Sequence, residues 1–190
     1  MPFSHTTSLQ GQFLVAMPKL ADSEFDRALI YVIEHNEEGA MGLVINQPID
    51  MTVDEILEQV DAEYSFMYHP QMALCGGPVE NTRGFILHRT RSDRHWIGEM
   101  PLNNGLSVTA SADILNAMIR NDDIGPYLFA LGYSGWAAGQ LENEMLDNAW
   151  LSIPASADLL FNTEPEHLLE CAVRELGISY SQLSNVAGHA

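Results

Sequence analysis

The sequence contains few basic residues. Its 190 residues include 8 lysines and arginines against 26 aspartates and glutamates, which gives a formal net charge of -18 at pH 7. Binding to phosphate chains depends on basic side chains that displace counterions, so the bulk charge repels nucleic acids and anionic membranes. We therefore expect neither direct DNA binding nor binding to a membrane surface.

Cysteine is also scarce, and long apolar runs are absent. The two cysteines, Cys75 and Cys171, form no CxxC pair and no Cys/His spacing typical of zinc sites. No apolar run approaches the roughly 20 residues that a membrane-spanning helix needs. Residues 1–10 lack the pattern of a signal peptide, which is a basic segment followed by an apolar one. These absences predict a soluble, cytoplasmic protein with reduced cysteines.

Common signatures of catalysis and DNA recognition are missing as well. The sequence has no HExxH metal motif and no dinucleotide-binding fingerprint. Gly76-Gly77-Pro78 is followed by neither a helical pattern nor a lysine, so it is not a phosphate-binding loop and is expected to form a tight bend. No helix-turn-helix pattern with a basic recognition helix is present. We predict no cofactor, no metal site and no catalytic residue set, and a binding protein is favoured over an enzyme.

The apolar pattern predicts an α+β fold with a mixed sheet. Short unbroken apolar runs are typical of buried strands, and the runs at 28–33 and 40–45 form a hairpin across a Gly-ended loop. We expect one domain over residues 1–190, with about 1–8 and 187–190 loosely ordered, rather than a doubly wound parallel fold. The expected strands are 13–17, 28–33, 40–45, 72–75, 84–88, 106–109, 127–133 and 148–153; the expected helices are 53–60, 111–120, 137–146, 156–161 and 165–176.

Several element ends carry specific signals. Thr52 and Glu55 form a capping box at the start of one helix, and Ser111 is expected to cap another. Pro165 suits the first position of the last long helix, and Gly177 suits its end. The strand 106–109 alternates as a half-buried strand does, and an edge strand is expected around 96–100. The tail from 178 onward is expected to be loosely ordered, apart from Leu183 and Val186.

The segment from Gly132 to Gln140 is the most distinctive stretch. It follows an apolar run and contains three glycines, so it predicts a turn between a strand and a helix, a common place for a binding site. Ser134 invites comparison with the nucleophile elbow, but the second glycine follows it directly, and Trp136 stands where the elbow needs glycine. We therefore expect turn formation or capture of a small ligand, with Ser134, Gly135, Trp136 and Gln140 as candidate ligand-binding residues.

Other polar residues at expected strand ends are further candidates. Glu34, His35 and His88 are plausible ligand-binding residues by type, although their spacing matches no metal motif. Asn46 ends the strand 40–45 and is added to this set. Four arginines lie between residues 83 and 94, which predicts either a solvated loop that balances nearby acids or a small anion-binding or partner-binding surface.

Long, ordered motifs resemble those of the YqgE/AlgH family. The resemblance runs from about residue 9 to the end of the chain. It implies an α+β fold with a strongly bent mixed sheet and flanking helices, but no catalytic residue set, because the family is largely uncharacterised. Gln47 stands where many relatives have arginine, which weakens an anion-binding role at that corner. The matching motifs are residues 13–18, Glu34-His35-Asn36, residues 39–48, Gly76-Gly77-Pro78-Val79, residues 83–88, residues 131–142, residues 148–151 and residues 187–190.

Two functional hypotheses follow. One branch of the family is labelled as transcriptional regulators, yet the charge balance disfavours DNA. The first hypothesis is therefore a regulatory or partner-binding protein that acts without direct DNA contact. The second is a small-ligand-binding protein or enzyme that uses a cleft at Gly132–Gln140. The partner would be an unknown protein or small molecule, and a homo-oligomer is a further alternative.

Overall fold

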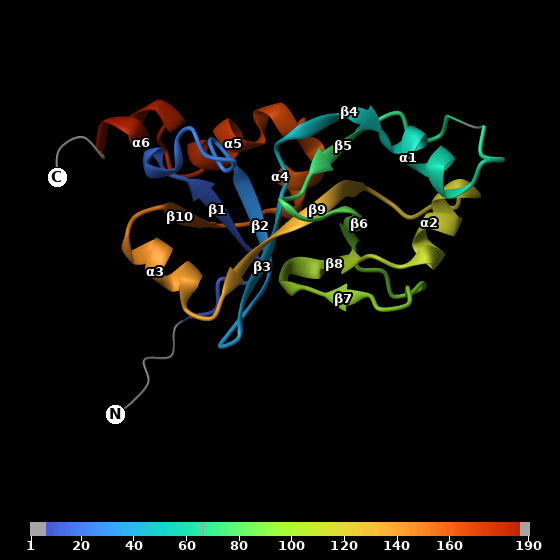
Figure 1. Cartoon of the computed structure of the whole chain (residues 1–190), viewed down its shortest axis with the longest axis horizontal. Helices are drawn as coiled ribbons and strands as arrows, with labels where there is room; N and C mark the ends of the chain where they lie inside the picture. Colours follow the sequence, from blue (N-terminus) through green and yellow to red (C-terminus); the bar gives the residue numbers. More distant parts are fainter. Residues whose placement is uncertain (1–6, 66, 187–190) are drawn as a thin grey trace.

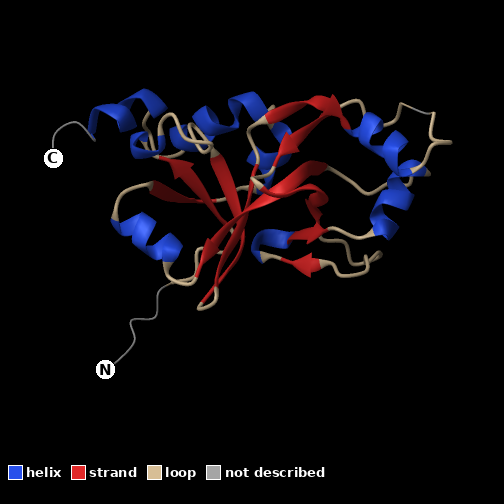
Figure 2. Ribbon diagram, viewed as in Figure 1, coloured by secondary structure: helices blue, strands red, loops and turns tan. Residues whose placement is uncertain are grey.

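The computed structural model describes residues 7–65 and 67–186, with the side chains of 184–186 left aside. Strands occupy the middle of the molecule and helices lie at its ends and along one side (Figures 1 and 2). The strands are β1 (Gln12–Ala16), β2 (Leu29–Asn36), β3 (Gly39–Val44), β4 (Pro48–Thr52), β5 (Met72–Cys75), β6 (Val79–Arg89), β7 (Met100–Pro101), β8 (Leu106–Thr109), β9 (Tyr127–Ala137) and β10 (Trp150–Pro154). The helices are α1 (Val53–Val60), α2 (Ala112–Ile119), α3 (Gln140–Leu146), α4 (Ala157–Asn162), α5 (Pro165–Arg174) and α6 (Tyr180–Val186).

The expected mixed sheet is confirmed. The described strands form one curled sheet with the order β10-β1-β2-β3-β9-β6-β8-β7, and β4 and β5 attach to β9 at its side. Neighbouring strands are antiparallel except β5 and β9, which pair in parallel at Leu74–Ala130 and Cys75–Leu131. The expected hairpin is the β2–β3 pair, and residues 29–33 are fully buried as their apolar run predicts.

β9 joins the two halves of the sheet. Its first part, with Tyr127 and Phe129, pairs with β6, whereas its last part, from Ser134 to Ala137, pairs with β3. The backbone at Gly76 and Gly77 crosses β9 so closely that a Cβ on Gly76 would lie 2.3 Å from the carbonyl oxygen of Gly132. Gly76-Gly77-Pro78 is therefore more than the tight bend that its composition predicts, because only glycine fits this crossing.

Three apolar clusters fill the described part of the molecule. The largest lies between one side of the sheet and α4 to α6, and includes Phe13, Tyr31 and Leu168. A second packs α1 and α2 against the sheet around Phe129. The third holds α3 against the sheet through Leu141. No described helix has the length and apolar composition that crossing a bilayer requires.

The helix signals give mixed outcomes. The capping box is confirmed, because Glu55 N–H donates to Thr52 Oγ1 and Thr52 N–H donates to Glu55 Oε2. Ser111 precedes α2, but the expected side-chain cap is wrong, because its hydroxyl donates to Asp113 Oδ1 instead. Pro165 begins α5, as expected. Gly177 lies beyond Arg174, the last residue of α5, and has a φ of 76°. Val60 and Leu176, the last residues of the expected helices 53–60 and 165–176, are exposed because each lies at or beyond the helix end.

Other boundaries also differ from expectation. The strand β8 is buried at all four positions rather than half-buried, because β6 and β7 flank it and apolar clusters cover it. The edge strand is only Met100–Pro101, since ion pairs hold much of the preceding loop. The tail is not wholly irregular, because α6 forms and buries Tyr180 and Leu183. Residues 1–6 and 187–190, expected to be loosely ordered, lie outside the described residues.

The crossing of Gly76 over β9 gives a stability prediction. A Gly76→Ala substitution places a methyl group against a backbone oxygen, so we expect the free energy of unfolding to fall by more than about 2 kcal/mol. Gly135→Ala is the matched control, because its Cβ would meet only the Tyr133 side chain, at 3.3 Å, and its effect should stay within about 1 kcal/mol. Urea unfolding measures both. Equal effects would contradict the close crossing.

Candidate functional site

Most of the distinctive glycine-rich segment is strand. β9 continues from Tyr127 to Ala137 without a break, the turn falls at residues 138–139, and α3 begins at Gln140 rather than at residue 137. The strand-turn-helix expected at Gly132–Gln140 is therefore present, but its turn was expected too early, between the strand 127–133 and a helix from residue 137. Glycine suits this strand because Gly132, at a φ of 74°, lies against the Gly77 carbonyl, where a Cβ would come within 2.5 Å.

Ser134 is enclosed inside the sheet. Its side chain is fully buried, its hydroxyl donates to the carbonyl oxygen of Gly76 at 3.3 Å, and its backbone pairs with Gly42. Gly135, its neighbour, is exposed and pairs with Met41. A nucleophile needs an adjacent base and access to a substrate. The environment of Ser134 offers packing and one hydrogen bond, so it supports a structural role.

Trp136 and Gln140 belong to a polar cluster that holds α3 on the sheet. The indole N–H groups of Trp136 and Trp150 both donate to Glu144 Oε2, at 2.9 and 2.7 Å. Gln140 Nε2 donates to the other oxygen of Glu144 at 2.9 Å, and its own oxygen accepts from Ala137 N–H. Glu144 therefore carries three hydrogen bonds, and the amide of Gln140 is engaged at both ends.

His35 and Glu34 lie near this cluster but serve other contacts. The Leu9 N–H donates to His35 Nδ1 at 2.9 Å, so the ring proton sits on Nε2, which donates to Glu142 Oε1 at 3.0 Å. This bond ties β2 to α3. Glu34 is exposed, accepts a hydrogen bond from Asn36, and lines a small hollow of about 200 Å³ beside Trp136.

Asn46 and His88 lie elsewhere. Asn46 accepts from Leu29 N–H and donates to the carbonyl of Arg27, so it fastens the start of β2. His88 is buried, and its Nδ1–H donates to the carbonyl of Arg89 while Nε2 accepts from the Thr109 hydroxyl at 2.8 Å. His88 pairs with Tyr127, so about 23 Å of strand separates it from Ser134.

The eight candidate residues therefore do not converge on one site. They fall into a group around α3, the buried side chain of Ser134, the corner at Asn46 and the buried side chain of His88. Their role in ligand binding stays a prediction. Among the residues that the structure describes, no three His, Cys, Asp or Glu side chains gather as metal ligands would.

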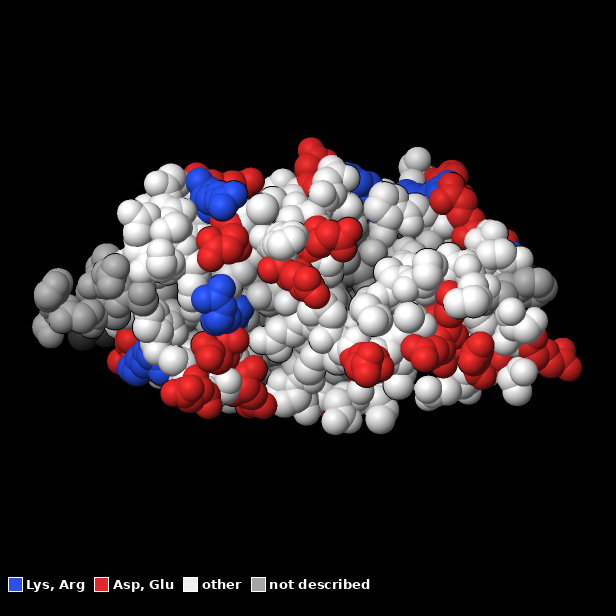
Figure 3. Space-filling view, turned by 90° about the horizontal axis from the view of Figure 1, so that it is seen from above, with Lys and Arg blue, Asp and Glu red and all other residues white. Residues whose placement is uncertain are grey.

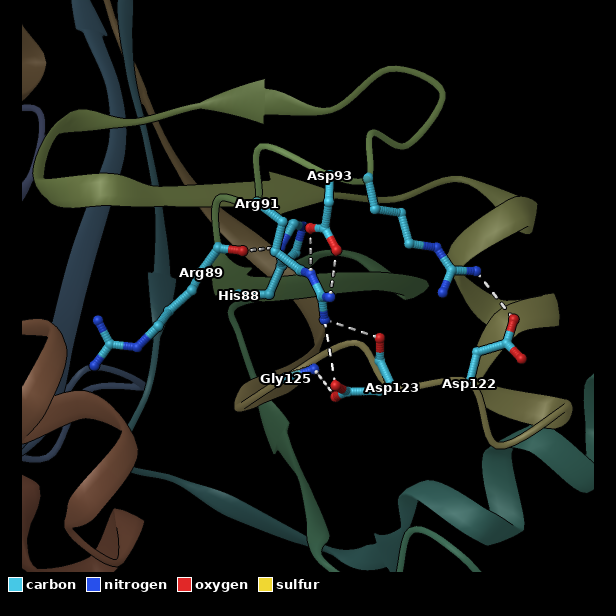
Figure 4. A network of polar contacts seen from close by, with 8 residues as sticks. His88, Arg89, Arg91, Asp93, Asp122, Asp123 and Gly125 are labelled. Carbon is cyan, nitrogen blue, oxygen red and sulfur yellow. Dashed lines mark hydrogen bonds and ion pairs between the residues drawn. The ribbon is translucent and has the colours of Figure 1, made fainter.

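The arginine-rich segment is paired with acids (Figure 4). Arg91 binds Asp93 through two hydrogen bonds of 2.9 and 2.8 Å and reaches across to Asp123 at 3.4 Å. Arg94 binds Asp122 at 3.0 Å. These bonds join the loop after β6 to the loop before β9. Arg83 and Arg89 pair with Glu80 and Asp158, so the segment balances nearby acids, as one of the two interpretations predicts.

A hollow of about 700 Å³ lies in a different place, beside β5 and β9. The two strands pair at only two positions, and their N-terminal residues Met72 and Tyr127 both line this cleft. The segment joining α4 and α5 lines it as well. We call this hollow the β5–β9 cleft. It is lined by Pro48, residues 70–72, Leu74, residues 125–129 and residues 160–167.

A buried polar network supports one wall of the β5–β9 cleft. His69 Nε2–H donates to the carbonyl of Met118 at 3.1 Å, so its Nδ1 is an acceptor and takes the Tyr127 hydroxyl proton at 2.7 Å. The His69 N–H and the Tyr64 hydroxyl both donate to Asp54 Oδ1, whereas Asp54 Oδ2 is buried without a partner. Burial, followed by the charge of Asp54, raises the pKa of Tyr127, which keeps its hydroxyl neutral.

The sequence carries no motif for this cleft. Its lining comes from four separate stretches of the chain, and most of the lining residues are aliphatic, aromatic or proline side chains. Pro70 and Gln71 fall between the expected helix 53–60 and the expected strand 72–75, where no element was expected. The one available signal was a proline beside the start of each of three elements, at Pro48, Pro126 and Pro165.

The fold and the chain's relatives define its family. Residues 13–181 match the family model described as AlgH-like, so the chain belongs to the AlgH-like family. A UPF0301 protein of Vibrio cholerae is 47% identical over 96% of this chain and 100% of that protein. A UPF0301 protein of Thioalkalivibrio sulfidiphilus is 45% identical over 97% and 98%. The resemblance seen in the sequence motifs is confirmed.

Two solved structures share the fold. The solution structure of the AlgH protein from Pseudomonas aeruginosa is 42% identical, covers 100% of both chains and has a TM-score of 0.79. A crystal structure of a Corynebacterium diphtheriae protein, 21% identical over 96% and 94% of the two chains, has a TM-score of 0.72 and shows a likeness of fold alone.

The ion pair of Arg91 gives a pH prediction. The hydrogen bond from Arg91 lowers the pKa of Asp93 from 3.8 to about 2. Because the folded-state pKa is the lower one, the pair's contribution to stability is complete above pH 3.8 and is lost as the pH falls toward 2. In Arg91→Gln, Asp93 should titrate near 3.8, as followed by NMR of its carboxyl carbon. Arg83→Gln, which breaks a different pair, should leave Asp93 unchanged; a wild-type pKa already near 3.8 would refute the pairing.

Proposed function

We propose that this protein is a regulatory, partner-binding protein that receives a segment of another protein in the β5–β9 cleft and acts without direct DNA contact. The observation that carries the proposal is the shape of this surface. A second hollow of about 280 Å³ lies beside the cleft, and Glu166 lines both. Gln47 lines the second hollow and the next residue, Pro48, lines the first, so the two hollows are neighbours; we treat them together as one surface, which we call the α5 groove.

The length and lining of the α5 groove suit a polypeptide. It runs past the first turn of α5, from Met72 and Tyr127 at one end to Arg27 and Asn46 at the other. The exposed side chain of Met72 and the ring of Phe161 offer apolar contact, as anchor pockets in protein interfaces do. A rounded cavity would favour a small molecule, whereas an elongated groove favours an extended chain.

The charge distribution disfavours DNA as the partner. Phosphate contacts need unpaired lysines and arginines, and the four arginines between residues 83 and 94 are all bound to acids. Seen from above, the face that carries α4, α5 and β4 shows acidic side chains spread widely and basic ones only in small groups beside them (Figure 3). A regulatory role would therefore act through protein contact.

A small ligand in the same cleft is the second candidate. Tyr127 lines the cleft, and its hydroxyl is oriented by hydrogen bonds to His69 and to the Gln71 side chain, which also lines the cleft. A cleft of about 700 Å³ falls within the roughly 300–1,000 Å³ of typical ligand pockets. This candidate replaces the cleft expected at Gly132–Gln140, where the structure has a strand and a short helix.

Site-specific photo-crosslinking tests the proposed function. A photoreactive phenylalanine analogue at Met72, which lines the cleft and is exposed, should form a protein adduct in the native host cell. The same analogue at Leu146 is the control, because Leu146 is exposed on α3, away from the groove. The purified partner should then bind the Met72→Lys variant at least about tenfold more weakly than Leu146→Lys.

Two results would count against this function. Equal adducts at both positions, or none at position 72, would show that the groove is not a docking surface. An adduct with a second copy of the chain would instead support a homo-oligomer.

A further inference from the structure

Carboxylates dominate the charge of the α5 groove. Glu164 and Glu166 line the β5–β9 cleft, and among its described lining residues there is no lysine or arginine. The second hollow adds Asp26 and Glu170. Its one basic residue, Arg27, is already engaged, 3.8 Å from Glu170 and over the ring of Tyr180. The surface therefore carries a surplus of negative charge next to apolar contact area.

Tyr127 offers no hydrogen-bond donor to an occupant. Its hydroxyl gives its proton to His69, whose own proton is committed to the carbonyl of Met118. Its oxygen is engaged by the Gln71 side chain, a hydrogen bond that opposes the rise in the pKa of Tyr127. The carboxylates of Glu164 and Glu166 therefore carry the preference for a cationic occupant. The positive end of α5, equivalent to about half a charge, is outweighed by the full charges of Glu164 and Glu166 in the same turn.

We infer that the occupant of the α5 groove is an extended protein segment that carries lysine or arginine side chains between apolar residues. This inference rests on the proposed function and specifies its partner. The apolar residues would contact Met72 and Phe161, and the cationic groups would lie against Glu164 and Glu166. The positive charge of such a segment would make its binding more specific. It would also speed its encounter with this protein, whose net charge is -18.

Selection from a random peptide library tests the inference. A phage library of random ten-residue peptides is selected on the folded wild-type protein, and the enriched peptides should be rich in lysine and arginine, with a net positive charge. Their synthetic forms should bind the double variant Glu164→Gln/Glu166→Gln about fivefold or more weakly, because each lost ion pair weakens binding. Replacing arginine by citrulline, its neutral analogue, should weaken binding to the wild type equally.

A matched double variant controls for net charge. Glu58→Gln/Glu63→Gln removes the same two negative charges from exposed positions in and after α1, so its affinity for the peptides should equal that of the wild type. Glu164 makes no side-chain cap, so its replacement should not unfold α5, which circular dichroism checks.

The inference would be overturned if no peptide were enriched, if the enriched peptides lacked basic residues, or if both double variants bound them equally. If an adduct formed at position 72 but any of these results were also found, the basic nature of the occupant would be contradicted, whereas the proposed partner-binding function would still be supported. If basic peptides were enriched but no adduct formed at position 72, the preference of the α5 groove for cationic segments would be supported, and the proposed function as a partner-binding protein would be contradicted.

Discussion

The course of β9 is the constraint on which the rest of the structure depends. This one strand pairs with β6 over its first part and with β3 over its last part, so it holds together the two halves of the curled sheet. Gly76, Gly77 and Gly132 permit the tight crossing between them. β5 pairs with β9 at only two positions, and the β5–β9 cleft lies beside these strands. The candidate site is thus a direct result of how the sheet is closed.

Much of the fold could be predicted from local sequence patterns. The apolar runs at 13–17 and 28–33 supply the fully buried strand positions 13–16 and 29–33, and the Thr52–Glu55 capping box marks the start of α1 to the residue. Such features depend on neighbours in sequence, which is why composition and periodicity reveal them. The loops and the last helix, α6, depend more on distant contacts and were predicted less well.

The glycine-rich segment shows why the site could not be predicted. A glycine such as Gly132 suits a turn, but it suits equally a strand pressed against another backbone, and the residues it meets, Gly76 and Gly77, are distant in sequence. The candidate residues were chosen because polar groups at strand ends often converge. Here each of Ser134, His35 and His88 satisfies a different structural hydrogen bond.

The proposed function is contact with protein rather than with nucleic acid. It is supported by the internal pairing of the arginine-rich segment and by the apolar and acidic lining of the α5 groove. The most direct test is fluorescence anisotropy of a labelled DNA duplex at low ionic strength, where electrostatic attraction is strongest. Our account predicts no rise in anisotropy as the protein is added. Saturable binding that weakens steeply with added salt would contradict it.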